Sequence, residues 1–146
     1  MNNKESKARS GLWVEVKIPQ EIENLARQAV DSAFLVHREL GPGLLESAYR
    51  DCFCHELSLR GIHFRKEILV PLCYRGMKVD SGFRADVLLE DKLVVELKAV
   101  ESVLPIHKAQ LITYLKVLGI PLGLLINFNE VLIKNGIHRT LNLRKS

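Results

Sequence analysis

Three charged residues in the middle of the chain are spaced so that they could catalyse hydrolysis together. Asp86 lies in segment 83–89, and Glu96 and Lys98 lie in segment 94–98, both otherwise rich in apolar residues. Alternation along a strand puts Glu96 and Lys98 on one face, and a hairpin about residues 90–92 brings Asp86 opposite the Glu96 region. Desolvated neighbouring carboxylates repel each other, and oxygen-only ligands suit Mg²⁺ or Mn²⁺. A salt-bridged strand, with Lys98 paired to Glu96 or Asp86, would give the same pattern without catalysis.

A second polar group lies at the start of a predicted helix. Glu46 is followed three and four residues later by Tyr49 and Arg50, so the three side chains share one helix face. A first-turn glutamate that favours the helix dipole, next to a core tyrosine, would explain the same spacing without a functional role.

A third polar group lies on the helix predicted after Pro105. His107, Gln110 and Tyr114 follow one another at intervals of three and four residues, which forms a single polar stripe. The solvated side of an ordinary apolar helix has the same appearance.

The hydrophobic periodicity predicts an α/β protein with a mixed central sheet. Its period is helical from Gln20 to residue 61 and changes to the alternation of strands after Gly61. The first predicted elements are a short strand at Leu12–Val16, a helix from Gln20 ended by Gly41-Pro42-Gly43, and a second helix from Leu45 stopped by Gly61. The next are strands at Glu67–Tyr74, Lys78–Leu89 and Leu93–Ala99, with turns at Arg75-Gly76 and Glu90–Lys92. The last are a helix from Pro105 stopped by Gly119, a buried strand at Leu122–Phe128 reached by a crossover, and a short strand near His138–Leu143.

The length of 146 residues, with 47% hydrophobic and 26% charged residues, predicts one domain with a real core. We expect a flexible leader at 1–18 and a single domain at 19–146. No apolar run approaches the ~20 residues that span a bilayer, and no signal peptide is evident, so we expect a cytoplasmic protein without a membrane partner. The three cysteines have the wrong spacing for a zinc site, and we expect buried free thiols.

The basic charge is concentrated in the second half of the chain. Residues 1–73 hold 10 Lys/Arg against 10 Asp/Glu, and residues 74–146 hold 11 against 7, which accounts for the whole net charge of +4. This excess is compatible with a polyanionic partner.

These residues carry a resemblance. Segment 43–49, GLLESAY, resembles the signature of the GxxExxY protein family, and Asp86 followed by ELK at 96–98 is similar to the core of the PD-(D/E)xK nuclease superfamily. The similarity covers roughly residues 20–143, which is almost the whole chain beyond the leader. Ala85 departs from the pattern, because the superfamily name expects proline there, at a position that is degenerate across the superfamily.

The resemblance implies a restriction-endonuclease-like fold and a metal-dependent phosphodiesterase that acts on DNA or RNA with Mg²⁺ or Mn²⁺. Nucleases of this size commonly dimerise to cut two strands, so a homodimer is among the expected partners. The alternative is a nucleic-acid-binding or protein-interaction module that kept the scaffold without the catalysis. The implied catalytic residues are Glu46, Asp86, Glu96, Lys98 and Gln110, of which Glu46, Asp86 and Glu96 would be metal ligands, with Tyr49, His107 and Tyr114 as supporting residues.

Overall fold

The two predicted helices at the start of the domain form where their apolar periodicity begins, and the first ends at a glycine. Pro19 precedes α2, whose first turn carries acidic residues that favour the positive end of the helix dipole. Gly41 ends α2 with a φ of 66°, in the left-handed region that glycine adopts without strain. Only a short loop separates this end from Glu46, the first residue of α3, so the helices meet at a tight corner.

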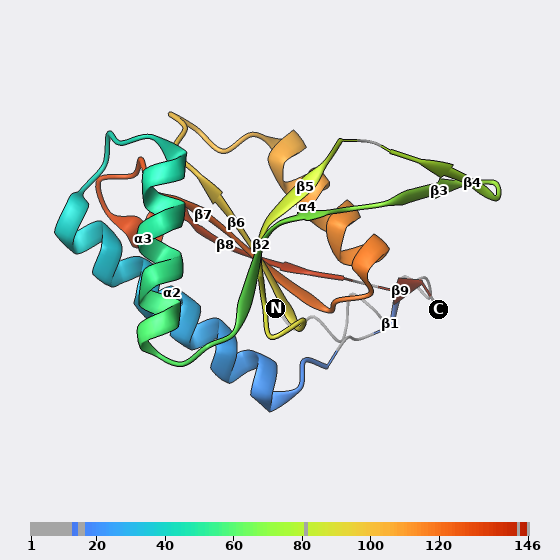
Figure 1. The fold of residues 1–146 in the computed structure, drawn as a ribbon, viewed down its shortest axis with the longest axis horizontal. Helices are drawn as coiled ribbons and strands as arrows, with labels where there is room; N and C mark the ends of the chain where they lie inside the picture. The colour runs from blue at the N-terminus through green and yellow to red at the C-terminus, as the bar shows by residue number, and fades with distance from the viewer. Residues whose placement is uncertain (1–12, 15–16, 81, 143, 146) are drawn as a thin grey trace.

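The computed structural model describes residues 13–14, 17–80, 82–142 and 144–145. Figure 1 shows their arrangement, a twisted sheet with helices on both faces. The elements in chain order are β1 (Trp13–Val14), α2 (Gln20–Leu40), α3 (Glu46–Leu59), β2 (Phe64–Leu69), β3 (Leu72–Tyr74), β4 (Met77–Val79), β5 (Arg84–Leu89), β6 (Leu93–Lys98), α4 (Pro105–Leu118), β7 (Leu122–Asn127), the 3₁₀ helix η1 (Ile133–Gly136), β8 (Ile137–Leu141) and β9 (Arg144–Lys145).

The central sheet is mixed, as the sequence predicts. Its five strands lie in the order β2-β5-β6-β7-β8. Only the β6–β7 pair is parallel among these neighbours, because α4 carries the chain from the end of one strand back to the start of the other. The parallel register places Lys98 opposite Asn127.

Two hydrophobic clusters, one on each face of the central sheet, hold the helices against it. Val95 and Leu97 of β6 are buried with side chains of α2 and α3, whereas Val94, from the same strand, is buried with Leu111 and Leu115 of α4. Alternate residues of one strand therefore face different helices, and β6 is covered on both sides. Among the described helices, none is long and apolar enough to cross a bilayer.

The two long strands predicted before residue 89 are each interrupted. Strand β2 starts earlier than expected and ends before Pro71, which has no N–H to donate to a ladder. The second predicted strand is divided into β4 and β5 by a turn in which the Asp80 carboxylate accepts the Gly82 N–H at 3.1 Å. The predicted turn at Arg75-Gly76 is correct, but it joins a separate two-stranded ribbon, β3–β4.

The predicted leader falls mostly on residues 1–12 and 15–16, which lie outside the described residues. Trp13–Val14 forms β1 and pairs antiparallel with β9. The predicted last strand is β8, which ends at Leu141; residue 143 lies outside the described residues.

The expectation of buried cysteines is correct only for Cys54. Cys52 and Cys73 are also free but exposed, because they lie on the outer side of α3 and on the isolated ribbon. Burial raises the pKa of the Cys54 thiol to about 11, so this sulfur is protonated and unreactive at neutral pH.

Candidate active site

Asp86 and Glu96 lie where the pairing between β5 and β6 ends. Their recorded register runs from Leu89 opposite Leu93 to Val87 opposite Val95. Beyond it, the Asp86 N–H donates to Glu96 Oε2 at 2.6 Å, and the Leu97 N–H donates to Asp86 Oδ2 at 2.8 Å. Each carboxylate thus accepts a backbone N–H from the other strand. This exchange fixes the two carboxylates relative to each other and to the sheet.

The two carboxylates share a buried environment that disfavours their negative charge. Glu96 is only 4% exposed, and burial, followed by the charge of Asp86, raises its pKa to about 8. Burial also raises the pKa of Asp86, although the Leu97 N–H and the charges of Lys98 and Arg50 oppose this rise. Bringing a cation to this pair would relieve the repulsion.

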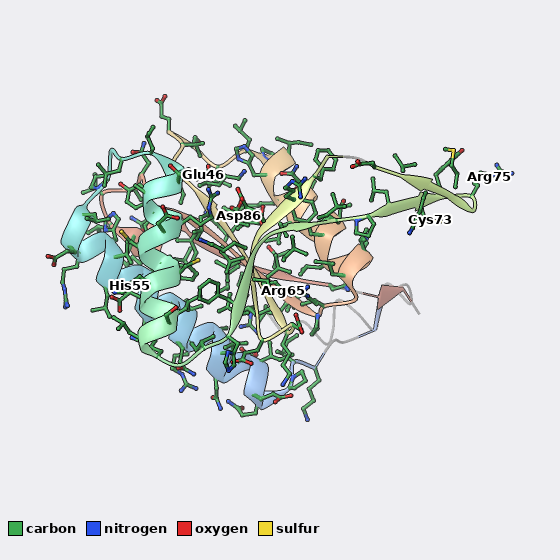
Figure 2. The ribbon with its side chains drawn as sticks, in the orientation of Figure 1. Glu46, His55, Arg65, Cys73, Arg75 and Asp86 are labelled. Atoms are coloured by element: carbon green, nitrogen blue, oxygen red, sulfur yellow. The ribbon has the colours of Figure 1, made fainter. Side chains whose placement is uncertain are left out.

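Glu46 joins this pair from the first turn of α3. Figure 2 shows it at the end of the helix nearest Asp86. Its half-buried carboxyl has a pKa raised first by burial and then by the charge of Asp86. The charges of the three carboxylates predicted as ligands therefore act on one another, although Glu46 precedes Asp86 and Glu96 by 40 and 50 residues.

Lys98 is the cation that these three carboxylates have in common. It is half-buried at the end of β6, and its charge lowers the pKa values of Glu46, Asp86 and Glu96. Within the described part of the chain, its ammonium group forms no ion pair within 4.0 Å. The simple salt bridge that would have explained the pattern without function is not present among these residues.

Two residues at the site are not among those predicted as catalytic or supporting, Arg50 and Glu67. Arg50 lies 4.0 Å from Asp86 Oδ1 and 3.5 Å from Glu67 Oε1, and its side chain is 20% exposed. Glu67 has a φ of 51° inside β2, and no pair is recorded for it between Lys66–Val87 and Ile68–Ala85. The spacing places Arg50 on the same helix face as Glu46, but it does not indicate which residues Arg50 contacts. The left-handed backbone of Glu67 left no sequence signal, since glycine or asparagine would be expected there.

Tyr49 has a structural role in placing Glu46. Its wholly buried hydroxyl donates to the Gly41 carbonyl at 2.6 Å and accepts the Leu44 N–H at 3.1 Å. Its ring stacks on Phe128, with centroids 4.6 Å apart. These contacts hold the loop before α3 and so fix the position of the first helical turn.

Tyr49→Phe is expected to lower the free energy of unfolding by about 1–3 kcal/mol, because two backbone groups of the loop lose their partner. Urea unfolding followed by circular dichroism would measure this change. Tyr74→Phe is a matched control, since Tyr74 is 63% exposed and its hydroxyl forms no hydrogen bond with the described residues. Equal unfolding midpoints for the two variants would contradict the role assigned to Tyr49.

The three residues of the predicted stripe on α4 have different surroundings. His107 Nδ1 accepts the Leu104 N–H at 3.0 Å and thereby caps the helix start. Tyr114 is 2% exposed, and burial, then the charges of Glu96 and Asp86, raise its pKa to about 12. The Tyr114 hydroxyl is therefore within electrostatic reach of the two carboxylates. Gln110 is half-buried one turn earlier on α4 and makes no side-chain hydrogen bond to the described residues.

The donor set suits a divalent cation in its chemistry, but its arrangement is not that of a closed metal site. No three His, Cys, Asp or Glu side chains among the described residues stand close enough together to hold a metal ion. Asp86 and Glu96 each use one oxygen for a backbone N–H, which leaves their second oxygens for a ligand. Carboxylate oxygens are the ligands that Mg²⁺ and Mn²⁺ prefer, so the residues present fit such an ion.

Cavity size does not locate this cluster. A cavity of about 610 Å³ lies between α2 and η1, lined in part by Phe34, Arg38 and Leu132, and contains none of the predicted site residues. The carboxylates are recognised instead by their burial and their mutual electrostatic effects, which are the features that perturb pKa values at catalytic sites.

Comparison with protein families gives one match. Residues 23–140 match the sequence profile of the PD-(D/E)XK nuclease superfamily. The chain belongs to this superfamily. Nucleases of the PD-(D/E)XK superfamily generally use divalent metals, and the mixed five-stranded sheet with flanking helices is consistent with their restriction-endonuclease-like fold. No curated protein and no solved structure gives a significant match to the chain.

The PD-(D/E)XK match spans all the residues predicted for the site. Ala85, at the position where the superfamily name has proline, is wholly buried in the cluster beneath α4 and pairs with Ile68 of β2. A small side chain is therefore accommodated at this position without disturbing Asp86, whose carboxylate and N–H both keep their hydrogen bonds across to β6.

Proposed function

We propose that the chain is a divalent-metal-dependent nuclease that hydrolyses phosphodiester bonds of DNA or RNA. The observation that carries this proposal is the buried pair of carboxylates, Asp86 and Glu96, locked together by reciprocal backbone hydrogen bonds with Lys98 beside them. Such a pair weakens the fold while it stays charged and empty, which is the signature of a site kept for a ligand.

Asp86 and Glu96, with Glu46, would hold the ion, Mg²⁺ or Mn²⁺. When bound, the ion supplies Lewis acidity at the phosphoryl group and makes a neighbouring water more acidic. The Asp86 and Leu97 N–H groups keep both carboxylates in fixed orientations, so little reorganisation is needed during the reaction. Burial and the charge of Asp86 raise the pKa of Glu46, which makes its carboxylate a stronger base than an ordinary glutamate.

Lys98 would stabilise the charge that develops on the phosphate. Negative charge gathers on the non-bridging oxygens as the phosphodiester is attacked, and a fixed ammonium stabilises that charge more than the charge of the ground state. Arg50 neutralises Asp86 and Glu67 on the other side of the cluster, and the structure supports a positioning role for it.

Cleavage of end-labelled single- and double-stranded DNA and RNA in Mg²⁺, Mn²⁺ or EDTA tests the proposal. We expect cleavage only with a divalent ion and a loss of at least about 100-fold in Glu96→Ala. Glu101→Ala is the matched control, because Glu101 is an exposed glutamate just beyond β6 without a partner among the described residues.

Equal cleavage by wild type, Glu96→Ala and Glu101→Ala would mean that a contaminant cuts. Absence of cleavage together with metal-independent binding of nucleic acid would favour the alternative, a non-catalytic binding module. Absence of both would favour a protein-interaction module. Membership of the GxxExxY family, a homodimer and a cytoplasmic location stay predictions.

A further inference from the structure

The β3–β4 ribbon projects from the body of the protein. Its two strands pair only with each other among the described residues, and Figure 1 shows them extending well beyond the sheet and helices. Residues 73–78 are all exposed. A two-stranded ribbon without a packed face is marginally stable in water, so its own folding gives no reason for its length or its direction.

The tip of the ribbon holds an arginine in an unfavourable backbone conformation. Arg75 has a φ of 49° and Gly76 a φ of 85°, and such two-residue turns favour asparagine or aspartate at the first position. Glu90 is similarly strained in the β5–β6 turn, but its carboxylate accepts the His63 N–H at 2.9 Å. Arg75 has no such contact with the described residues. Strain that local contacts do not explain points to a role for the guanidinium itself.

Positively charged residues are distributed along the ribbon, from its tip to the start of the strand that carries Asp86. Segment 68–79 contains no acidic residue, and neither Arg75 nor Lys78 forms an ion pair with a residue that the structure describes. At the base of the ribbon, the exposed Arg84 lies opposite Leu69 and two residues before Asp86. Of the two acidic residues that flank this segment, Asp80 accepts the Gly82 N–H and Glu67 pairs with Arg50 at 3.5 Å. The arm is therefore complementary to a polyanion that reaches the carboxylate cluster.

The shape of the arm suits one form of nucleic acid. The major groove of B-DNA is about 12 Å wide and admits a two-stranded ribbon, whereas the major groove of A-form RNA is too narrow for protein side chains to read. Tyr74 and Met77 are opposite each other in the register, and they are 63% and 58% exposed. They supply an apolar surface for base edges such as the thymine methyl group, while Arg75 and Lys78 contact phosphates.

We propose that the β3–β4 ribbon is a DNA-binding arm that enters the major groove of duplex DNA and holds the duplex against the carboxylate cluster. This inference rests on the proposed nuclease function and specifies its substrate class as double-stranded DNA. Figure 2 shows Arg75 at the far end of the arm and Asp86 on the body of the protein, so the arm contacts DNA away from the bond that is cut.

Fluorescence anisotropy in EDTA tests the arm independently of cleavage. The probes are a labelled duplex DNA, its single strand and a duplex RNA of the same sequence, with wild type, Arg75→Asn, Lys78→Gln and the control Lys134→Gln. Asparagine suits the turn, so Arg75→Asn should fold at least as well as wild type, which thermal unfolding would verify. Lys134 is exposed in η1, which packs on α2 and β7 rather than on the ribbon.

Wild type is expected to bind duplex DNA most tightly of the three probes. Arg75→Asn and Lys78→Gln should each weaken binding roughly tenfold at about 50 mM salt and lower the slope of log K against log salt by about 1, while Lys134→Gln binds as wild type does. Unchanged affinity in both arm variants, tighter binding of single strands or RNA, or no binding by wild type would overturn the proposal.

The outcome for the arm is separable from the outcome for catalysis. If wild type cuts DNA with Mg²⁺ and the arm variants bind as tightly as wild type, the DNA-binding role of the arm is wrong and the proposed nuclease function is retained. If the arm variants lose binding and wild type cuts nothing under any metal condition, the arm stands on a protein that binds duplex DNA without cutting it.

Discussion

Glu96→Gln is expected to make the metal-free protein more stable at pH 8 by more than about 2 kcal/mol, because each unit of pKa difference corresponds to about 1.4 kcal/mol. Glu96 loses its proton near pH 4.5 in the unfolded chain and only near pH 8 in the folded one. The folded state therefore holds the extra proton between these values, and the wild type loses stability as the pH rises through this window. Glutamine stays neutral and can still accept the Asp86 N–H, so the loss is absent in the variant.

Urea unfolding in EDTA at pH 4.5 and pH 8 measures this effect. The gain from Glu96→Gln should be small at the lower pH, where the wild-type carboxyl is protonated in the folded state and about half protonated in the unfolded state, and large at the higher pH. Glu101→Gln should change little at either pH, because Glu101 is exposed. A gain of equal size at both values, or a loss at pH 8, would contradict the buried charge as its cause.

Adding a divalent ion should make the wild type more stable than Glu96→Gln, which reverses their order in EDTA. Under the proposed function, Mn²⁺ would bind the folded wild type and stabilise it by mass action, whereas Glu96→Gln lacks one of the proposed ligand charges and should gain much less. Glu96 would thus lower the stability of the metal-free protein and raise the stability of the metal-bound protein. This exchange of stability for ligand binding is what a functional carboxylate pair requires, and a structural salt bridge would not produce it.

The sequence predicted those parts of the site that depend on local signals. The hairpin that brings Asp86 to Glu96 follows from alternation and the turn at residues 90–92, and the corner that places Glu46 follows from the glycines at 41 and 43. The interruption after β2 is not predicted because residues 68–74 form one nearly continuous apolar run that resembles a single strand. The effect of Pro71 on the ladder depends on which neighbour its missing N–H would face.

The positions of Arg50 and Glu67 at the site are determined by tertiary contacts, which the sequence pattern does not predict. Arg50 reaches Asp86 and Glu67 only because α3 packs against the sheet at this point. Glu67 adopts its positive φ within β2, where pattern alone predicts extended backbone. Tyr49 and His107 were predicted near the site but serve as a loop anchor and a helix cap. Polar residues close to a site in sequence often hold the backbone that positions it.

Lys98→Met is expected to lower kcat for phosphodiester cleavage by about 100- to 1,000-fold, the effect of removing one preorganised group that stabilises transition-state charge. Metal binding should survive this change. The charge of Lys98 favours the ionised forms of Glu46, Asp86 and Glu96, but it also repels an incoming cation, so Mn²⁺ affinity should stay within about tenfold of the wild-type value.

Comparing Lys98→Met with Glu96→Ala separates the two roles. Glu96→Ala should lose both Mn²⁺ binding, measured by titration calorimetry, and cleavage, whereas Lys98→Met should lose cleavage alone. Lys116→Met, which removes an exposed lysine of α4, is the matched control and should retain both. If Lys98→Met lost Mn²⁺ binding as completely as Glu96→Ala, Lys98 would act by holding the carboxylates in place. Near wild-type cleavage in Lys98→Met would remove it from the mechanism, because a cation that stabilises charge only in the transition state must appear in kcat.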